Sequence, residues 1–479
     1  MINTKPIHIL RTFSSAQLVE FEKFLNSPVF NTNKMVIQLF DIVKVYAPNF
    51  DSEQLLRNNV YSKLFGNDQL DESKLRYVAS DLAQVLEDYI SWFEFQKSRQ
   101  QKNLFLLDYY RKADLERYFN QILDEENKLQ EKNPIKDSTW FFHQYLLEEN
   151  AYQYSQQKKS RSLDNNLQTL VDYLDLFYIS NKLKHSGEML TREVLLRIKY
   201  KKPLLDSVLE FLKEDNIQDF LAVELYHNVI QMHLYPDETT HYYRLLELLE
   251  TNRNNISKLE RVDLFVFAQN YCTAQINSGK TEFLKEVFDL YKKMIEQDAI
   301  YDDSGDIRLN VFKNIVTVGI RLEEFDFVES FIENFKNKLD ADKRESAIQY
   351  NMAWLNYAKK DYKGALRLLS MAEFADIFYL LGSKCLQLKI FLETEEYDAF
   401  YALCESFYVF LRRNKIIADY QKEAHLEFIK YIKQLGRIKM TKNMNAAAKL
   451  YSNLQGDVGL IDRSWFLKKV EEINPKLKK

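Results

Sequence analysis

The chain has 479 residues, of which 46% are hydrophobic and 28% are charged, a composition typical of a folded protein. Gly and Pro together supply only 17 residues, so sandwiches, barrels and Gly-rich nucleotide-binding folds are disfavoured, because their turns need many more. The net charge of −4 excludes a bulk field that would drive the chain onto nucleic acid or anionic lipid. Apolar residues recur at three- and four-residue spacing along nearly all of the sequence, which predicts helices.

The first 205 residues are expected to form an irregular set of helices. Ser14 and Gln17 form a capping box before the first of them, and Asp51 with Gln54 opens a short helix that reaches Phe65. Asp71 opens a long helix. Besides the helices that begin at Asp51 and at Asp71, the pattern predicts helices at 15–26, 33–46, 101–111, 114–131, 138–157 and 163–184.

From about residue 218 the pattern becomes periodic. An Asn occupies the same slot in the first helix of four predicted hairpins, at Asn228, Asn270, Asn314 and Asn351, and a fifth unit has Leu386 there. Three positions in the predicted second helix follow each of these residues at the same offsets of 11, 14 and 18. After Asn228, for example, they are Thr239, Tyr242 and Leu246. The units are 42, 44, 37 and 35 residues apart. Fixed geometry within a unit and variable spacers between units are typical of stacked helical hairpins.

Residues 345–373 resemble a tetratricopeptide repeat. The matching residues of the first helix are Asn351, Met352 and Ala353, and those of the second are Asp361, Tyr362, Ala365, Leu369 and Ala372. The resemblance covers about 218–435. It implies a right-handed α-solenoid of helical hairpins, in which Asn at this slot holds the backbone of a bound peptide.

We therefore expect an all-α protein in three parts. Residues 1–205 form a helical N-terminal region, 206–440 form tetratricopeptide-like repeats, and 441–479 form C-terminal capping helices. In the last part, a helix at 439–454 precedes a break at Gly456 and Gly459. A capped helix then begins at Asp462 and is expected to cover the open end of the array.

The Asn series supplies the candidate binding site, because an amide offers one acceptor and two donors to an extended peptide. The alternative is that these amides brace or cap adjacent hairpins. Lys313 and Arg321 would favour an acidic segment or a C-terminal carboxylate. The candidate peptide-binding residues are Asn228, Gln231, Asn270, Thr273, Lys313, Asn314, Thr317, Arg321, Asn351 and Trp354.

Motifs for catalysis, metals and cofactors are weak. Gly279-Lys280-Thr281 ends like a phosphate-binding loop but follows a predicted helix and not a strand. Glu224 and His227 have the spacing of a carboxylate-bridged metal site, for which a second copy is needed, although His233 and His241 are close in sequence. We expect no catalytic residues, no metal and no cofactor.

The cysteines and the N-terminal sequence bear on the compartment. Cys272, Cys385 and Cys404 lie in apolar helical surroundings and are expected to be core residues in a reducing compartment. The sequence has no signal-peptide pattern and no stretch of about 18 apolar residues, so a cytoplasmic protein is expected.

The leading functional hypothesis is a scaffold or adaptor that binds an extended segment of another protein in a concave groove. The alternative is a helical-repeat protein that binds nucleic acid through two basic segments. Residues 180–202 carry a net charge of +5, and residues 410–450 carry +7. Such binding would fall steeply with salt. A third possibility is an enzyme whose site is assembled from residues far apart in the sequence.

Overall fold

The computed structural model describes residues 1–66, 71–157, 165–196, 198–214, 220–302, 304–374, 376–415, 417–456 and 460–477. Their regular structure is helical, apart from one isolated antiparallel bridge between Tyr301 and Ile307. The predicted all-α class is therefore confirmed. The chain divides into two compact units, which are considered separately below: residues 1–133 with 139–175, and residues 134–138 with 176–479. The division at 175 lies within a helix and precedes the predicted boundary at 205.

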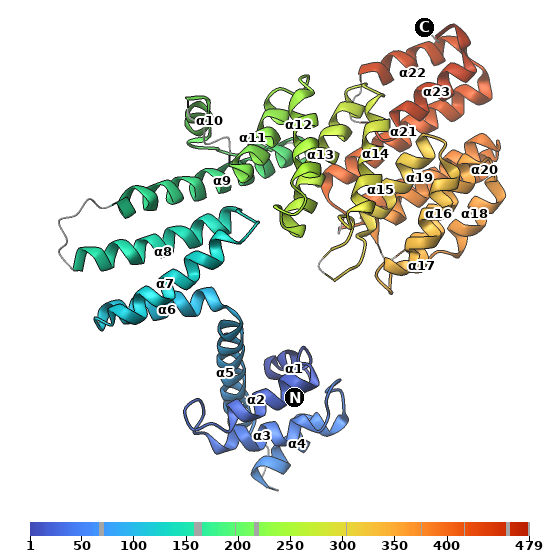
Figure 1. Cartoon of the computed structure of the whole chain (residues 1–479). Coiled ribbons are helices and arrows are strands. Elements are labelled where there is room, and N and C mark those ends of the chain that lie inside the picture. The colour runs from blue at the N-terminus through green and yellow to red at the C-terminus, as the bar shows by residue number, and fades with distance from the viewer. Residues whose placement is uncertain are drawn as a thin grey trace. The chain divides into compact units, whose positions relative to one another are not determined.

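The first unit consists of seven short or medium helices and one long one, followed by the start of α9 (Figure 1). Their bounds are α1 Lys5–Leu10, α2 Ser15–Leu25, α3 Lys34–Lys44, a 3-10 turn at Glu53–Leu55, α4 Arg57–Phe65, α5 Glu72–Lys97, α6 Arg99–Lys112, α7 Glu116–Glu131, α8 Ser138–Gln157 and α9 Asn165–Leu196.

Side-chain caps begin several of these helices where the sequence predicts them. Ser14 and Gln17 form the predicted capping box of α2, and Asp71 accepts hydrogen bonds from the backbone of Ser73 and Lys74 at the start of α5. The helix predicted to open at Asp51 differs from the structure. Ser52 caps a 3-10 turn instead, and α4 begins only after it, at Arg57. The last helix, α9, continues twelve residues beyond its predicted end.

Two separate cores hold the first unit together. Helices α1–α5 bury a hydrophobic cluster in which Tyr89 of α5 contacts the rings of Phe13, Phe21 and Phe24. Helices α6, α7 and α8 share a smaller cluster around Phe119. These aromatic contacts stabilise helix packing, as the Phe- and Tyr-rich faces predict.

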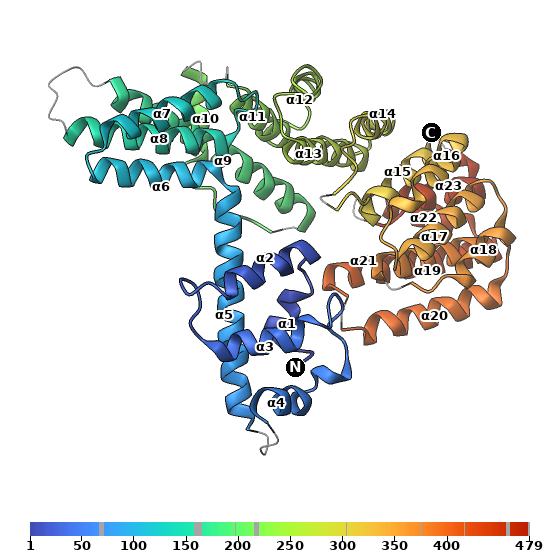
Figure 2. The ribbon, with the colours of Figure 1, turned by 60° about the horizontal axis from the view of Figure 1, so that its bottom comes forward.

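The second unit is a succession of helices (Figures 1 and 2). After α9 their bounds are α10 Leu205–Glu214, α11 Leu221–Leu234, α12 Thr240–Thr251, α13 Lys258–Asn277, α14 Phe283–Glu296, α15 Leu309–Arg321, α16 Phe325–Phe335 with a 3-10 turn at Lys336–Lys338, α17 Arg344–Ala358, α18 Tyr362–Met371, α19 Ile377–Glu393, α20 Tyr397–Arg413, α21 Asp419–Thr441, α22 Met444–Gly456, α23 Arg463–Ile473 and a final 3-10 turn at Pro475–Leu477.

The five predicted hairpins are present as helix pairs from α11/α12 to α19/α20. Each first helix also contacts a neighbouring first helix: α11 contacts α13, α15 contacts α17, and α17 contacts α19. Contacts between first helices thus join α11 to α13, and α15 to α17 and α19, whereas α15 meets the preceding hairpin through α14.

Four of the hairpins turn in the same way. The turn residue has a left-handed backbone at Gly279, Glu323, Lys360 and Glu395, with φ of 104°, 61°, 65° and 62°. In each turn the next backbone N–H donates to the carbonyl five residues earlier, at 2.8–3.0 Å. This pair of features is the Schellman C-cap, which satisfies the carbonyls at a helix end. The same turn also follows α6 at Asp114 and α14 at Asp298, so it is a recurrent helix ending in this chain and is not confined to the hairpins.

The C-terminal helices continue the packing of the last hairpin. Buried residues of α19–α23 form one hydrophobic core, to which α23 contributes Phe466 and Val470. The single helix predicted at 439–454 is instead divided between α21 and α22, because Lys442 adopts a left-handed backbone with φ 50°. The predicted break at Gly459 lies outside the described residues.

Candidate functional site: a basic groove closed by the C-terminal segment

The second unit contains a cavity of about 640 Å³. The first helices of successive hairpins supply its wall, from the end of α13 through α15, α17 and α19, and α21 adds His425. The segment that leads into α23, Leu460–Trp465, supplies the remaining side. We call this cavity the groove, and the segment Leu460–Trp465 the C-terminal segment.

One face of α15 contributes two cations to the groove. Lys313, Thr317 and Arg321 are spaced four residues apart, so they lie on the same side of the helix, and all three line the cavity. The Lys313 ammonium lies 5.6 Å from the ring centroid of Tyr350. Burial lowers the pKa of Lys313 and of Arg321, while the nearby carboxylate of Asp462 opposes both shifts. Partial desolvation makes such cations seek an anion.

A third cation, Lys389 of α19, is buried and forms an ion pair. Its side chain is only 2% exposed, and its ammonium lies 2.6 Å from a carboxylate oxygen of Asp462. The same ammonium lies 4.8 Å from the ring centroid of Trp354 and 4.9 Å from that of Trp465. A desolvated cation in contact with an indole gains about 2 kcal/mol. Lys389 therefore joins the groove wall to the C-terminal segment.

Asp462 is the carboxylate that interacts with these cations. It precedes α23, where an Asp is expected to cap the helix, but its side chain makes no cap hydrogen bond. Instead it pairs with Lys389 and also acts electrostatically on Lys313, Arg321 and His425. The predicted cap at Asp462 is thus corrected: the carboxylate faces the groove and not its own helix.

His425 of α21 adds an imidazole to the groove. Its Nδ1–H donates to the carbonyl of Gln421 at 2.7 Å. Burial lowers the pKa of His425, and Lys313 lowers it further, whereas the Gln421 hydrogen bond and Asp462 act in the opposite direction. The groove thus brings together four Lys and Arg side chains, including Arg463 of the C-terminal segment, and one imidazole around a single carboxylate.

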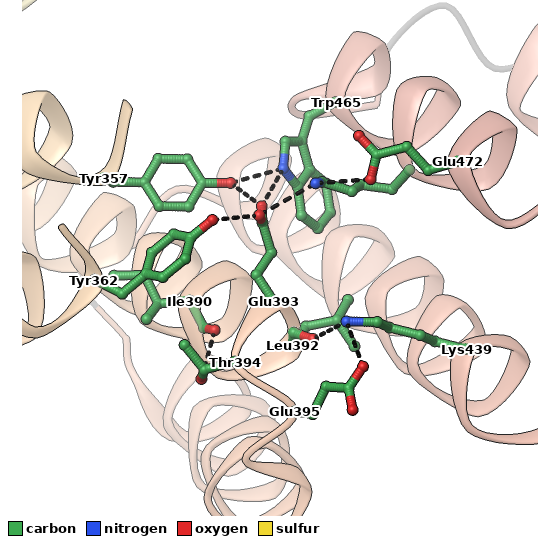
Figure 3. A network of polar contacts seen from close by, with 11 residues as sticks. Tyr357, Tyr362, Ile390, Leu392, Glu393, Thr394, Glu395, Lys439, Trp465 and Glu472 are labelled. Carbon is green, nitrogen blue, oxygen red and sulfur yellow. Dashed lines mark hydrogen bonds and ion pairs between the residues drawn. The ribbon is translucent and has the colours of Figure 1, made fainter. Parts of the chain in front are cut away.

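Trp465 ties the C-terminal segment to the array through Glu393 (Figure 3). Its Nε1–H donates to the Tyr357 hydroxyl at 2.8 Å and approaches the Glu393 carboxylate at 3.3 Å. Tyr357 and Tyr362 both donate to Glu393, and Lys469 of α23 pairs with it at 3.1 Å. Burial opposes ionisation of Glu393, but these donors and Lys469 outweigh it, so its pKa is lowered.

Five of the ten predicted peptide-binding residues line the groove: Lys313, Asn314, Thr317, Arg321 and Trp354. Asn314 also hydrogen-bonds the buried hydroxyl of Tyr291, where it opposes the rise in pKa that burial causes. Half-buried Asn270 and exposed Thr273 lie on α13 but do not line this cavity.

The other three predicted residues brace the array, which was the alternative interpretation of the Asn series. Asn228 is buried, donates to the Glu224 carbonyl and contacts the His241 ring of the paired helix. Asn351 is 1% exposed and donates to the Ala347 carbonyl. Gln231 is buried beside His227. These three amides point into helix packing, so the structure does not place them in a groove.

Sequence reasoning missed Lys389, His425, Asp462 and Trp465. One signal was available for Lys389, since it is one of two lysines, with Lys384, within the apolar run of α19. An isolated charge on a buried face needs a partner. The sequence does not identify that partner, because Asp462 reaches Lys389 only through the return of the C-terminal segment.

The weak motifs have ordinary structural positions. Gly279-Lys280-Thr281 forms the turn between α13 and α14. Glu224 pairs with Arg244 at 2.8 Å, and His227 contacts Gln231. Within the described ranges, nowhere do three His, Cys, Asp or Glu side chains gather as a metal site would need. The three cysteines are free and buried, and burial raises the pKa of each of them.

The basic segments are partly neutralised by local acids. In 180–202, Lys184 faces Asp263 at 3.9 Å and Lys202 pairs with Glu193 at 2.6 Å. In 410–450, Lys433 pairs with Glu405 at 2.5 Å and Lys439 with Glu395 at 3.3 Å. Arg197 and Ile416 lie outside the described residues.

Comparison of the chain with protein-family models, with curated proteins and with solved structures found no match. Among the described residues, none of the helices has both the length and the apolar character that crossing a bilayer requires.

Proposed function

We propose that this protein is an interaction scaffold or adaptor whose tetratricopeptide-like hairpins form a right-handed solenoid with a peptide-binding concave side. Two features support the proposal: consecutive helix pairs, and contacts between first helices from α11 to α13 and from α15 to α19. First helices that pack side by side from α15 to α19 give a surface on which a segment of another protein can lie.

The observation that carries the proposal is the charge of the groove. Lys313, Arg321 and Lys389 line it, and Asp462 is the carboxylate that acts on all three. Trp354, Tyr350 and Tyr357 add aromatic walls. Partly desolvated cations in a concave surface attract acidic groups and set the orientation of a ligand. The ligand is accordingly an extended acidic segment, and no bond is made or broken.

The cytoplasm is the proposed compartment. Free, buried Cys272, Cys385 and Cys404 support it, because thiols stay reduced there.

The test is selection of a random peptide library on the immobilised full chain. The wild-type chain is compared with K313Q/R321Q, which removes two groove cations. K363Q/R367Q is the matched control, since Lys363 and Arg367 are exposed on α18 and do not line the groove. We expect acidic peptides to be enriched on the wild-type chain and on the control.

Binding of those peptides should weaken about ten-fold or more in K313Q/R321Q, the effect of losing about 1.4 kcal/mol of interaction. Equal enrichment on both double variants, or enrichment without acidic residues, would contradict the proposal. Single-stranded DNA and RNA are measured alongside. Nucleic-acid binding that persists in K313Q/R321Q and falls steeply with salt would favour the alternative function.

A further inference from the structure

The C-terminal segment occupies the groove in the way that a bound ligand would. Its residues line the cavity opposite α15, α17 and α19. It supplies the carboxylate of Asp462, the guanidinium of Arg463 and an indole that packs on Lys389. The chain therefore contains, in its own sequence, an example of what this groove binds.

Two features at the start of α23 favour the contact with Lys389 and lower the stability of the helix itself. Asp462 has a left-handed backbone with φ 55°, which costs a non-Gly residue about 1 kcal/mol. Its carboxylate is also withheld from capping α23, a role worth about 1 kcal/mol. Both features are unfavourable for the helix, and both direct the carboxylate to Lys389.

Asp462 and Trp465 act together because Asp462 immediately precedes α23 and Trp465 lies in the first turn of that helix. The carboxylate and the indole contact the same ammonium, at 2.6 Å and at 4.9 Å to the ring centroid. The indole N–H then donates to Tyr357 on the opposite wall (Figure 3). The recognised element is thus an acidic residue followed three positions later by a large aromatic one.

The groove has further positive charge that this segment leaves unmatched. Lys313 and Arg321 feel the Asp462 carboxylate, but neither forms an ion pair with any residue that the structure describes. The Asp462 side chain is 35% exposed, so solvent and an incoming ligand can reach its pair with Lys389. A more acidic segment in the same place would satisfy all three cations.

We propose that the partner of this groove presents an acidic residue just before a helix and, three positions later, an aromatic residue in the first turn of that helix, and that it binds by displacing Asp462 and Trp465. The C-terminal segment is then an internal competitor that holds the groove closed until such a partner is present. This inference rests on the proposed function, since it names the partner and the regulation of that same groove.

Displacement can be followed at Cys385, which lines the groove and is buried. The full chain is treated with a thiol reagent, and mass spectrometry measures the labelling rate of each cysteine separately. In D462N/W465A we expect Cys385 to react at least about ten-fold faster than in the wild-type chain, as its access opens. Cys272 and Cys404 lie in the helix packing and report on general unfolding in the same molecule.

The matched control is E405Q/Y408A. Glu405 and Tyr408 have the same acid-to-aromatic spacing on α20, are 65% and 43% exposed and do not line the groove. It should leave the labelling of Cys385 unchanged. An unchanged rate at Cys385 in D462N/W465A, or equal acceleration at all three cysteines, would overturn the closed-groove arrangement.

Competition is measured with a fluorescent peptide that copies residues 460–469, and with the same peptide carrying Asn at the Asp462 position. We expect the first peptide to bind D462N/W465A at least about ten-fold more tightly than the wild-type chain, and the Asn peptide to bind neither. K313Q/R321Q is added to D462N/W465A to confirm that the peptide occupies the groove.

The outcomes separate the two proposals. If acidic peptides bind the wild-type chain and D462N/W465A equally, the groove function stands and internal competition is overturned. If neither the copied peptide nor an acidic library peptide binds either protein, both proposals are overturned. Cys385 labelling that slows, together with a mass that doubles, as protein concentration rises would assign the occupant to a second copy of this chain and overturn a foreign partner.

Discussion

The ammonium of Lys389 lies 2.6 Å from the carboxylate of Asp462, and the two are unequally exposed: the lysine side chain is 2% exposed and the aspartate 35%. This asymmetry has an energetic consequence. If Asp462 is removed, a cation remains buried without its partner. If Lys389 is removed, the Asp462 carboxylate can still be hydrated, because it is already partly exposed.

Asp462→Asn and Lys389→Met should therefore differ in stability. We expect D462N to lower the free energy of unfolding by about 2 kcal/mol, because it leaves a buried charge unpaired. K389M keeps the apolar stem between Trp354 and Trp465 and should cost less than about 1 kcal/mol. Denaturant unfolding followed by tryptophan fluorescence measures both. Equal losses would contradict the asymmetry, and K389M/D462N should be no less stable than D462N.

Glu393 should control how firmly α23 is attached. Glu393→Gln removes the ion pair with Lys469 and weakens the acceptor shared by Tyr357, Tyr362 and Trp465. We expect a loss of about 2 kcal/mol, seen as faster hydrogen exchange of the α23 amides. Glu472→Gln is the control, since Glu472 is 50% exposed and contacts only the other side of Lys469. Similar exchange in E393Q and E472Q would count against the network.

The same carboxylate gives α23 attachment an acid dependence. The pKa of Glu393 is lowered in the folded chain, so the unfolded chain binds a proton first as pH falls. Its stabilisation is full above the ordinary pKa of 4.5 and is lost as pH falls through the lower folded value. Exchange of α23 measured from pH 6 down to pH 3 should accelerate in the wild-type chain, and this acceleration should shrink in E393Q.

His233 should destabilise the chain in mild acid. Burial lowers its pKa from 6.5 to about 4, and its ring contacts the Thr191 hydroxyl at 2.9 Å. As pH falls below 6.5 the unfolded chain takes up the proton first, so stability is lost, and the loss levels off below about pH 4. Between pH 7 and pH 4.5 this amounts to about 2 kcal/mol. Urea unfolding at both pH values should show a smaller drop in H233Q. His185→Gln, at an exposed position on α9, should leave the drop intact.

Gly382 allows α19 to approach Tyr350 of α17. A Cβ at this position would overlap the Tyr350 hydroxyl and lie 3.0 Å from the ring carbon that bears it. Gly382→Ala should therefore lower the free energy of unfolding by about 1–3 kcal/mol. Removing the hydroxyl in Y350F/G382A should restore part of that loss, because the closest atom is gone. If the loss of unfolding free energy in Y350F/G382A equals the sum of the losses in Y350F and G382A, the strain does not arise from the Tyr350 hydroxyl.

Local sequence signals predict the helices well, because caps and apolar periodicity act over a few residues. Ser14 and Asp71 illustrate this. The division of the chain and the extension of α9 depend instead on packing between distant residues. The α15 cations were predictable because their spacing puts them on one face. Lys389 with Asp462 was not, because only the return of the C-terminal segment brings them together.

The Asn series shows how a correct periodicity can have the wrong role assigned to it. Asn228 and Asn351 recur because each satisfies a carbonyl of its own helix and reaches a side chain of another, His241 and Tyr379. Asn is polar, so the pattern alone does not distinguish a groove wall from a buried brace. Burial decides between them, and Asn351 is 1% exposed.

Asn351→Ala should consequently change stability and leave peptide affinity unchanged, whereas Arg321→Gln should change peptide affinity and leave stability nearly unchanged. N351A removes a buried amide that donates to Ala347 and reaches Tyr379, so we expect a loss of about 1–2 kcal/mol in unfolding free energy with acidic-peptide affinity unchanged. R321Q removes a partly desolvated groove cation that still reaches solvent and has no ion pair among the described residues, so stability should stay within about 0.5 kcal/mol while affinity falls. Denaturant unfolding and peptide anisotropy on the same preparations test both. A loss of affinity in N351A at full stability would return Asn351 to the groove wall.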